Sequence, residues 1–244
     1  MKYTDLIFDL YGTLVDIHTE ENDTVWEKTS FYFGFHGARY TPAELKAAFR
    51  AELRSREAQA GQSYECFPDI PFEQVMAALF RKRGMDEKAD DLGFHAAQLF
   101  RICSLDYVNL YPGVLDALAQ LREKGCRLWL LSNAQRAFTA YELNHLGLVP
   151  YFDGIYISSD FGCRKPDLRF FTALLEEQKL DPKNCLMIGN DLDTDIAGAK
   201  NAGLATLYMH TNLTPPDQRC ADPENPNEYE GWDWAELVQT IENL

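Results

Sequence analysis

Short apolar runs alternate with amphipathic segments through the second half of the chain. The runs have the length of strands and read CRLWLLSN, GIYISS, CLMIGN and ATLYMH, and LIFDLYG near the N-terminus is of the same kind. They are separated by segments with apolar residues three and four positions apart, the spacing of an amphipathic helix. Strands that alternate with helices predict right-handed crossovers and an α/β fold, a doubly wound parallel sheet with helices on both faces.

The helical segments of this half have defined ends as well as an apolar face. PGVLDALAQLREKG is predicted to turn Val114, Leu115, Leu118 and Leu121 inward, and Gly125 is a typical helix stop. Further helices are predicted at AFTAYELNHLGL, DLRFFTALLEEQKL and TDIAGAKNAG. A Pro- and acid-rich loop then precedes a last predicted helix, which begins at about Trp234.

Between about residues 40 and 105 the pattern is helical, with no strand-like alternation. TPAELKAAFRAELRSREAQA opens with a Thr cap and a Pro, and FEQVMAALFRKRG and DDLGFHAAQLFRICSL are amphipathic at helical spacing. We therefore predict two domains. A core is made of residues 1–15 and 111–244, and an all-helical domain of residues 16–110 is inserted into it.

Composition and charge exclude some classes of function. The 244 residues are 46% hydrophobic and 25% charged, which is ordinary for a globular protein. A formal net charge of −15 argues against nucleic-acid binding, which needs basic patches. No apolar run approaches the roughly 20 residues that span a bilayer, and no signal-peptide cleavage site is evident. The six cysteines form no CxxC pair and are expected to be reduced thiols of a cytoplasmic protein.

Polar residues stand at the carboxyl ends of three predicted strands. They are Asp9, the pair Ser132 and Asn133, and the group from Asn190 to Asp195. Ligands of parallel α/β sheets bind beyond these ends. A carboxylate held in line with an electrophilic centre can act as a nucleophile, giving a covalent intermediate that water later cleaves. Asp9 is the candidate for that role.

The motifs that contain these residues resemble those of the haloacid dehalogenase-like (HAD) hydrolase superfamily. FDLYGTL carries Asp9, LLSN carries Ser132, RKPD carries Lys165, and IGNDLDTDIAGAKNAG comes last, in the family's order. The helical insert resembles the cap of members whose lid follows the first motif. The resemblance implies a hydrolase with a Rossmann-like core and an active site shared by the four motifs.

The resemblance assigns roles that agree with the chemistry of each residue. Thr13 can hydrogen-bond the nucleophile or substrate oxygens, or stabilise the turn. Ser132 and the backbone amides near Asn133 can hold anionic oxygens as a helix N-terminus does. Lys165 precedes a proline, so its backbone is extended and its ammonium can offset anionic charge. The predicted substrate-binding residues are Gly12, Arg39, Ser132, Asn133 and Lys165.

The fourth motif indicates a magnesium site. Family phosphatases ligate the ion with the nucleophile, the backbone carbonyl two residues later, and an acid of a GDxxxD or GDxxxxD pattern. Here Asn190 replaces the usual first acid, and Asp191 has the right spacing from Asp195 for the shorter form. The predicted ligands of Mg²⁺ are Asp9, the carbonyl of Tyr11, and Asp191 or Asn190, with Asp195 as a ligand or a support.

Tyr11 stands where family phosphatases have an aspartate that protonates the leaving oxygen and later activates water. Tyrosine, with an unperturbed pKa of about 10, is a poor substitute at neutral pH. The L-2-haloacid dehalogenases of the family have tyrosine there and need no metal, so Tyr11 favours dehalogenase chemistry. However, Phe171 stands where they place another tyrosine, and the fourth motif is acid-rich. Acids beside Asp9 repel one another unless a cation lies between them, and magnesium supplies one.

We therefore predict a magnesium-dependent phosphatase that acts on a small phosphorylated metabolite through an aspartyl-phosphate intermediate. The alternatives are a C–X hydrolase of the L-2-haloacid dehalogenase type and a non-catalytic binding protein. The partner expected is a small anionic substrate, for which Arg39 and His36 of the aromatic segment SFYFGFHGARY are candidate contacts. No nucleic-acid, membrane or protein partner is predicted.

Overall fold

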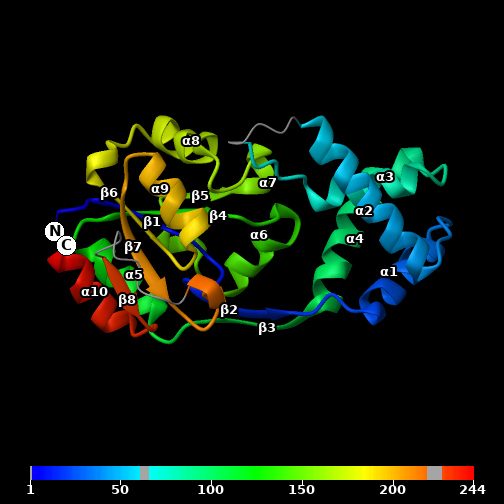
Figure 1. Ribbon diagram of the computed structural model, residues 1–244. Helices are drawn as coiled ribbons and strands as arrows, with labels where there is room; N and C mark the ends of the chain where they lie inside the picture. Colours follow the sequence, from blue (N-terminus) through cyan, green and yellow to red (C-terminus); the bar gives the residue numbers. More distant parts are fainter. Residues whose placement is uncertain (1, 61–65, 219–226) are drawn as a thin grey trace.

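The core of the molecule is a six-stranded parallel sheet in the order β5-β4-β1-β6-β7-β8. The structure, a computed structural model, describes residues 2–60, 66–218 and 227–244. Figure 1 shows β1 in the middle of the sheet, between β4 and β6. The strands are β1 (Asp5–Phe8), β4 (Arg127–Ser132), β5 (Gly154–Ile157), β6 (Cys185–Gly189), β7 (Ala205–His210) and β8 (Glu228–Glu230).

Helices cover both faces of this sheet. Leu6 and Phe8 of β1 face a hydrophobic cluster shared with α5, α6 and α10, whereas Ile7 faces a second cluster shared with α8 and α9. This alternation arises because successive side chains of a strand point to opposite faces. The arrangement confirms the predicted doubly wound α/β fold. The helices are α5 (Val114–Glu123), α6 (Arg136–His145), α8 (Leu168–Gln178), α9 (Ala197–Asn201) and α10 (Trp234–Asn243).

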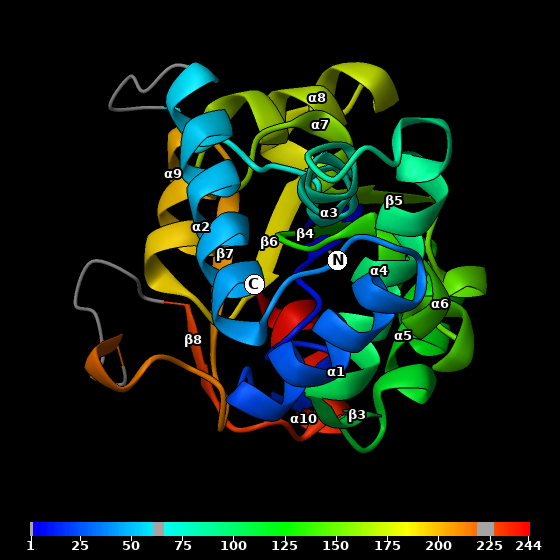
Figure 2. The ribbon, with the colours of Figure 1, turned by 90° about the vertical axis from the view of Figure 1, so that its right-hand side faces the viewer.

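The remaining long helices pack around a hydrophobic cluster of their own. They lie to one side of the sheet in Figure 1, and Figure 2 views the molecule from that side. Thr41 and Glu44 form the capping box that starts α2, and Gly93 lets α4 approach α3, since a Cβ there would lie 2.6 Å from the Glu73 carbonyl oxygen. These helices are α1 (Asp23–Phe35), α2 (Pro42–Gln59), α3 (Phe72–Arg81) and α4 (Ala89–Ser104).

A two-stranded antiparallel sheet of β2 (Val15–Thr19) and β3 (Leu105–Leu110) joins the helical part to the core. These strands are not predictable from the sequence pattern, because about half of their side chains are exposed and the apolar signal is weak. They lie at the two expected junctions, and the Tyr111 amide donates to the Leu14 carbonyl there. The division into residues 1–15 with 111–244 and residues 16–110 remains a prediction.

The segment that precedes α3 makes a third connection between the helical part and the core, through hydrogen bonds rather than through the chain itself. Pro68 pairs in an antiparallel bridge with Cys163, and the Phe67 carbonyl accepts a hydrogen bond from the Arg164 amide. Residues 67–72 therefore lie against loops at the carboxyl edge of the sheet, next to α7 (Ser158–Phe161).

The expected reduced thiols and the expected lack of a membrane-spanning segment can be compared with the structure. Among the described residues no cysteine forms a disulfide bond, and Cys220 lies outside the described residues. Within the described ranges, every helix is too short or too polar to cross a membrane. The expected cytoplasmic location remains a prediction.

Candidate active site

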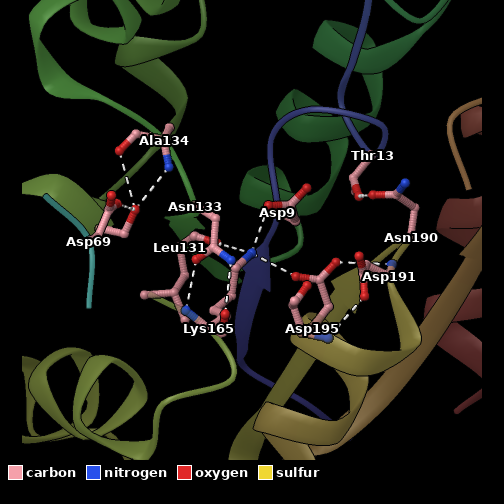
Figure 3. Close-up of polar contacts among 12 residues, drawn as sticks. Asp9, Thr13, Asp69, Leu131, Asn133, Ala134, Lys165, Asn190, Asp191 and Asp195 are labelled. Atoms are coloured by element: carbon pink, nitrogen blue, oxygen red, sulfur yellow. Dashed lines mark hydrogen bonds and ion pairs between the residues drawn. The ribbon is translucent and has the colours of Figure 1, made fainter. Parts of the chain in front are cut away.

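A cavity of about 250 Å³ opens at the carboxyl ends of β1, β4 and β6. Most of the predicted site residues line it, together with Thr194 of the fourth motif and Leu213 and Pro215 after β7. Figure 3 shows how the side chains of the motifs converge there. The predicted residues in the lining are Asp9, Tyr11, Asn133, Lys165, Asn190, Asp191 and Asp195.

The Lys165 ammonium is the centre of the site. Its Nζ donates hydrogen bonds to Asp9 Oδ1 at 2.7 Å, to Asp195 Oδ1 at 2.6 Å and to the Leu131 carbonyl at 2.7 Å. The side chain is only 1% exposed, so its three protons are fully used inside the protein. Burial lowers the pKa of Lys165, but the two carboxylates outweigh it and hold the pKa above its ordinary value.

Asp195 is a buried support rather than an open donor. Its Oδ1 accepts from Lys165, and its Oδ2 accepts from the Asp191 amide at 3.2 Å. Burial raises the pKa of Asp195 to about 7 against the opposing effect of Lys165, and Asp9 adds to the rise. Asp191 in turn uses its Oδ1 to cap the π-helical turn Leu192–Ile196 that leads into α9.

Asn190 is packed against the turn that follows Asp9. Gly12 has a φ of +88°, and a Cβ there would lie 2.4 Å from the Asn190 amide nitrogen, so a side chain at position 12 would displace Asn190. Thr13 donates to Asn190 Oδ1 at 3.2 Å. The hydroxyl of Thr13 therefore contacts the fourth motif, whereas the sequence predicts a contact with the nucleophile, the substrate or the turn.

The second motif contributes a positioning group and an unpaired hydroxyl. The Asn133 amide brackets the backbone of Lys165, with Nδ2 donating to the carbonyl at 3.0 Å and Oδ1 accepting from the amide at 2.8 Å. Ser132 Oγ is buried and has no hydrogen-bond partner among the described residues. Leaving a buried hydroxyl unpaired is costly, so Ser132 Oγ is a candidate contact for a ligand oxygen, although Ser132 is not among the residues that line the cavity.

The Tyr11 side chain is held between helices rather than left free at the cavity. Its hydroxyl contacts Thr139 Oγ1 at 3.1 Å and donates to Glu142, both of α6. Arg101 of α4 donates to both oxygens of Glu142, at 2.6 and 3.0 Å, and its guanidinium lies 5.5 Å from the centre of the Tyr11 ring. Burial raises the pKa of Tyr11, and the Glu142 charge adds to the rise, so the phenol stays protonated at neutral pH.

Arg101 and Glu142 are not among the site residues predicted from the sequence. Glu142 stands three positions after Thr139, which places the two on one side of a helix, but nothing in the sequence marks that side as buried.

Arg39 and His36 are not brought to the cavity at Asp9. Arg39 is exposed and lines a separate groove beside Phe31 and Phe35 of α1, and His36 packs against Tyr32. Both follow the end of α1, in the helical part of the molecule. Their proposed contact with an anionic substrate remains a prediction that this arrangement does not support.

The oxygen donors that remain are of the kind that bind magnesium. Asp9 has a second oxygen that points away from Lys165, and Asn190 and Asp191 line the same cavity (Figure 3). Among the described residues no three His, Cys, Asp or Glu side chains form a metal-holding group, so neutral oxygens would complete the set. Such a mixture suits Mg²⁺, which usually keeps several waters.

The sequence predicts a magnesium ion between the acids, but in the structure the ammonium of Lys165 lies between Asp9 and Asp195.

Comparison with known proteins identifies the family. Residues 6–203 match the family model of the haloacid dehalogenase-like hydrolases. The chain belongs to this family. All four motifs of the HAD-like hydrolase lie inside the matched region, so the family match and the cavity involve the same residues.

Curated relatives of this HAD-like hydrolase include phosphatases. A glyceraldehyde 3-phosphate phosphatase of Methanothermobacter thermautotrophicus is 32% identical over 108 residues, 44% of this chain and 48% of that protein. The chain thus matches this relative over about half of its length. The pyrimidine 5'-nucleotidase PynA of Streptococcus pneumoniae is 25% identical over 223 residues, 86% of this chain and 85% of that protein.

Solved structures share the fold of this HAD-like hydrolase along the whole chain. A 2-haloacid dehalogenase from Pseudomonas syringae pv. Tomato DC3000 has a TM-score of 0.69 at 22% identity and covers 99% of both chains. The HAD-hydrolase YfnB from Bacillus subtilis bound to magnesium has a TM-score of 0.56 at 24% identity and covers 100% of both. At these identities the likeness establishes the fold and leaves the reaction open.

Proposed function

We propose that this HAD-like hydrolase is a magnesium-dependent phosphatase of a small phosphorylated metabolite. The observation that carries the proposal is the arrangement at Asp9, where one carboxylate oxygen is held by Lys165 and the other points away from it, beside Asn190 and Asp191. The phosphatases among its relatives support the same reaction class, one of them over 85% of its length.

In the proposed reaction Asp9 attacks the phosphorus atom with its second oxygen. The P–O bond to the leaving group breaks, and an aspartyl phosphate forms. Lys165 keeps the first oxygen in place and offsets negative charge, while Ser132 offers its unpaired hydroxyl to a phosphate oxygen. Water then cleaves the aspartyl phosphate, which releases inorganic phosphate and restores the carboxylate.

Magnesium would be held by Asp9, the Tyr11 carbonyl, and Asn190 or Asp191, and when bound it would neutralise charge on the phosphate oxygens. Asp195 supports Lys165 and the Asp191 backbone from behind. Support for this cofactor comes from the donor set and from the magnesium-bound relative named above.

Metal dependence tests the proposed function directly. Hydrolysis of p-nitrophenyl phosphate and of acetyl phosphate should fall at least about tenfold in EDTA and return when Mg²⁺ is restored. Phosphate release is measured with each substrate, and L-2-chloropropionate is assayed in parallel for chloride. Metal-independent chloride release without phosphate release would replace the phosphatase with a dehalogenase.

The dehalogenase remains the second candidate because position 11 offers no carboxylate. The Tyr11 hydroxyl is directed to Glu142 and is held protonated, so it is not a free acid at the leaving group. Halide departs without needing a proton, and dehalogenation is therefore compatible with a tyrosine here.

The missing acid predicts a preference for good leaving groups. Because general acid catalysis contributes about 10²–10⁴-fold, wild-type enzyme should hydrolyse aryl and acyl phosphates well and alkyl phosphates poorly. Tyr11→Asp should raise kcat for an alkyl phosphate by at least about tenfold and change kcat for an aryl phosphate by less. The ratio of the two kcat values is the measurement.

Tyr11→Phe is the matched control for this change, since it removes the hydroxyl without adding an acid. An equal gain in Tyr11→Phe, or no change in the ratio for Tyr11→Asp, would mean that proton donation does not limit the reaction.

A further inference from the structure

Asp69, in the segment before α3, inserts a buried carboxylate into the loops of the core. The residue is 9% exposed. Its Oδ2 accepts a hydrogen bond from Ser158 Oγ at 2.5 Å, and its Oδ1 accepts one from Gln135 Nε2 at 2.8 Å. Figure 3 shows Asp69 beside Ala134, on the other side of Asn133 and Lys165 from the fourth motif.

Ser158 connects Asp69 by hydrogen bonds to the loop that follows β4. The hydroxyl has one proton, and the short contact to a carboxylate directs that proton to Asp69. The lone pairs of Ser158 Oγ are then free to accept the Ala134 amide, which lies 2.9 Å away. The other polar contact of Ser158, to the Ala134 carbonyl, is longer at 3.2 Å.

Gln135 makes a second set of hydrogen bonds between the same loop and the helical part. Its Nε2 donates to Asp69, and its Oε1 accepts from the Phe72 amide at 2.7 Å. Residues 132–136, the strand-end loop, are therefore fixed by groups from residues 67–72. This loop carries Ser132, whose hydroxyl is unpaired, and Asn133, which brackets Lys165.

We propose that Asp69 is a positioning residue that sets the strand-end loop for anion binding, so that affinity for the phosphate group depends on a residue of the helical part. This inference rests on the proposed function for the identity of the anion. Asp69 itself does not line the cavity at Asp9, and it acts through Ser158 and Gln135.

Asp69→Asn keeps the shape of the side chain and removes its charge, so it is the first variant to test. The KM for p-nitrophenyl phosphate and the Ki for inorganic phosphate should both rise about fivefold to tenfold, because a misplaced loop weakens binding of substrate and transition state alike. The kcat should change less than about twofold. Asp90→Asn, at an exposed ion pair with Arg81, removes the same charge elsewhere and should change neither constant.

A double-mutant cycle tests whether Asp69 acts through Ser158. Asp69→Asn should raise Ki less in a Ser158→Ala background than in wild type, since the hydrogen bond from the Ala134 amide to Ser158 Oγ is already lost and only the contact of Asp69 with Gln135 remains. Leu45→Ala in the helical cluster serves as a stability control, because it should lower Tm without raising Ki. Additive effects in the cycle, or a Leu45→Ala enzyme with the same rise in Ki, would overturn the proposal.

Hydrogen exchange tests the positioning role of Asp69 independently of whether the protein is a phosphatase. Amides of residues 132–136 should exchange faster in Asp69→Asn than in wild type and Asp90→Asn. Absence of phosphatase activity in wild type would refute the proposed function while this comparison still reports on the loop. Unchanged exchange in Asp69→Asn would refute the positioning role even if the enzyme is a phosphatase.

Discussion

Replacing Asp9 with asparagine should lower kcat for every substrate by at least about 10³-fold, the largest effect expected of any change in this protein. The amide has nearly the same shape and can still accept a hydrogen bond from Lys165, but it cannot attack phosphorus to form the covalent intermediate. Because Lys165 keeps Asp195 as a charged partner, the Tm should fall less in Asp9→Asn than in a variant that removes Lys165. Steady-state kinetics with p-nitrophenyl phosphate and acetyl phosphate measures the loss.

The covalent intermediate supplies a second readout for Asp9. Acid quenching of wild-type enzyme during turnover should leave a phosphate-sized mass increase on the peptide that contains Asp9, and the Asp9→Asn enzyme should show none. Asp86→Asn, an exposed acid of the helical part, is the control and should retain full activity. An Asp9→Asn enzyme within about tenfold of wild type would remove Asp9 as the nucleophile.

Replacing Lys165 with methionine should damage both stability and catalysis. The change leaves Asp9 and Asp195 buried without their shared ammonium, and removing one partner of a buried ion pair costs about 3–5 kcal/mol in the free energy of unfolding. Loss of a charge aimed at the reacting group should lower kcat by roughly 10²–10³-fold. Urea denaturation and kinetics at neutral pH measure the two effects.

The stability loss in Lys165→Met should grow with pH. Burial raises the pKa of Asp195, and Lys165 lowers it in wild type, so the variant should have a still higher pKa at Asp195. A carboxyl whose folded-state pKa lies above its unfolded value favours folding while it is protonated and loses that contribution as pH rises through the folded value.

The deficit relative to wild type should therefore be smaller at about pH 6 than at about pH 9. Lys183→Met, at an exposed lysine, should show no such trend. A deficit of the same size at both values would place the loss in packing rather than in the unpaired acids.

The parts of the fold that could be predicted have a strong local signal. The strands next to Asp9, Ser132 and Asn190 are continuous apolar runs buried on both faces, and their ends are marked by polar residues. The shared edge of a parallel sheet then brings these ends together. The position of the cavity can therefore be predicted from the sequence.

What could not be predicted depends on contacts between residues far apart in the chain. Tyr11 meets Glu142 across 131 positions, and Glu142 meets Arg101 across 41. Asp69 reaches Ser158 across 89 positions, from a segment that shows neither helical nor strand periodicity. Arg101, Glu142 and Asp69 are residue types that are common at protein surfaces. Only the packing of the helices against the core shows how far they are buried and which residues they contact.

The placement of Tyr11 has a consequence for how such an active site could change over evolutionary time. An aspartate introduced at position 11 alone would lose the contacts that the Tyr11 hydroxyl makes with α6, while Arg101 would keep its ion pair with Glu142. Position 11, α4 and α6 form one unit, whose members are expected to be inherited together. A route from this site to one with an acid at position 11 can therefore begin with that single substitution, and later substitutions in α4 and α6 would adapt the two helices to it.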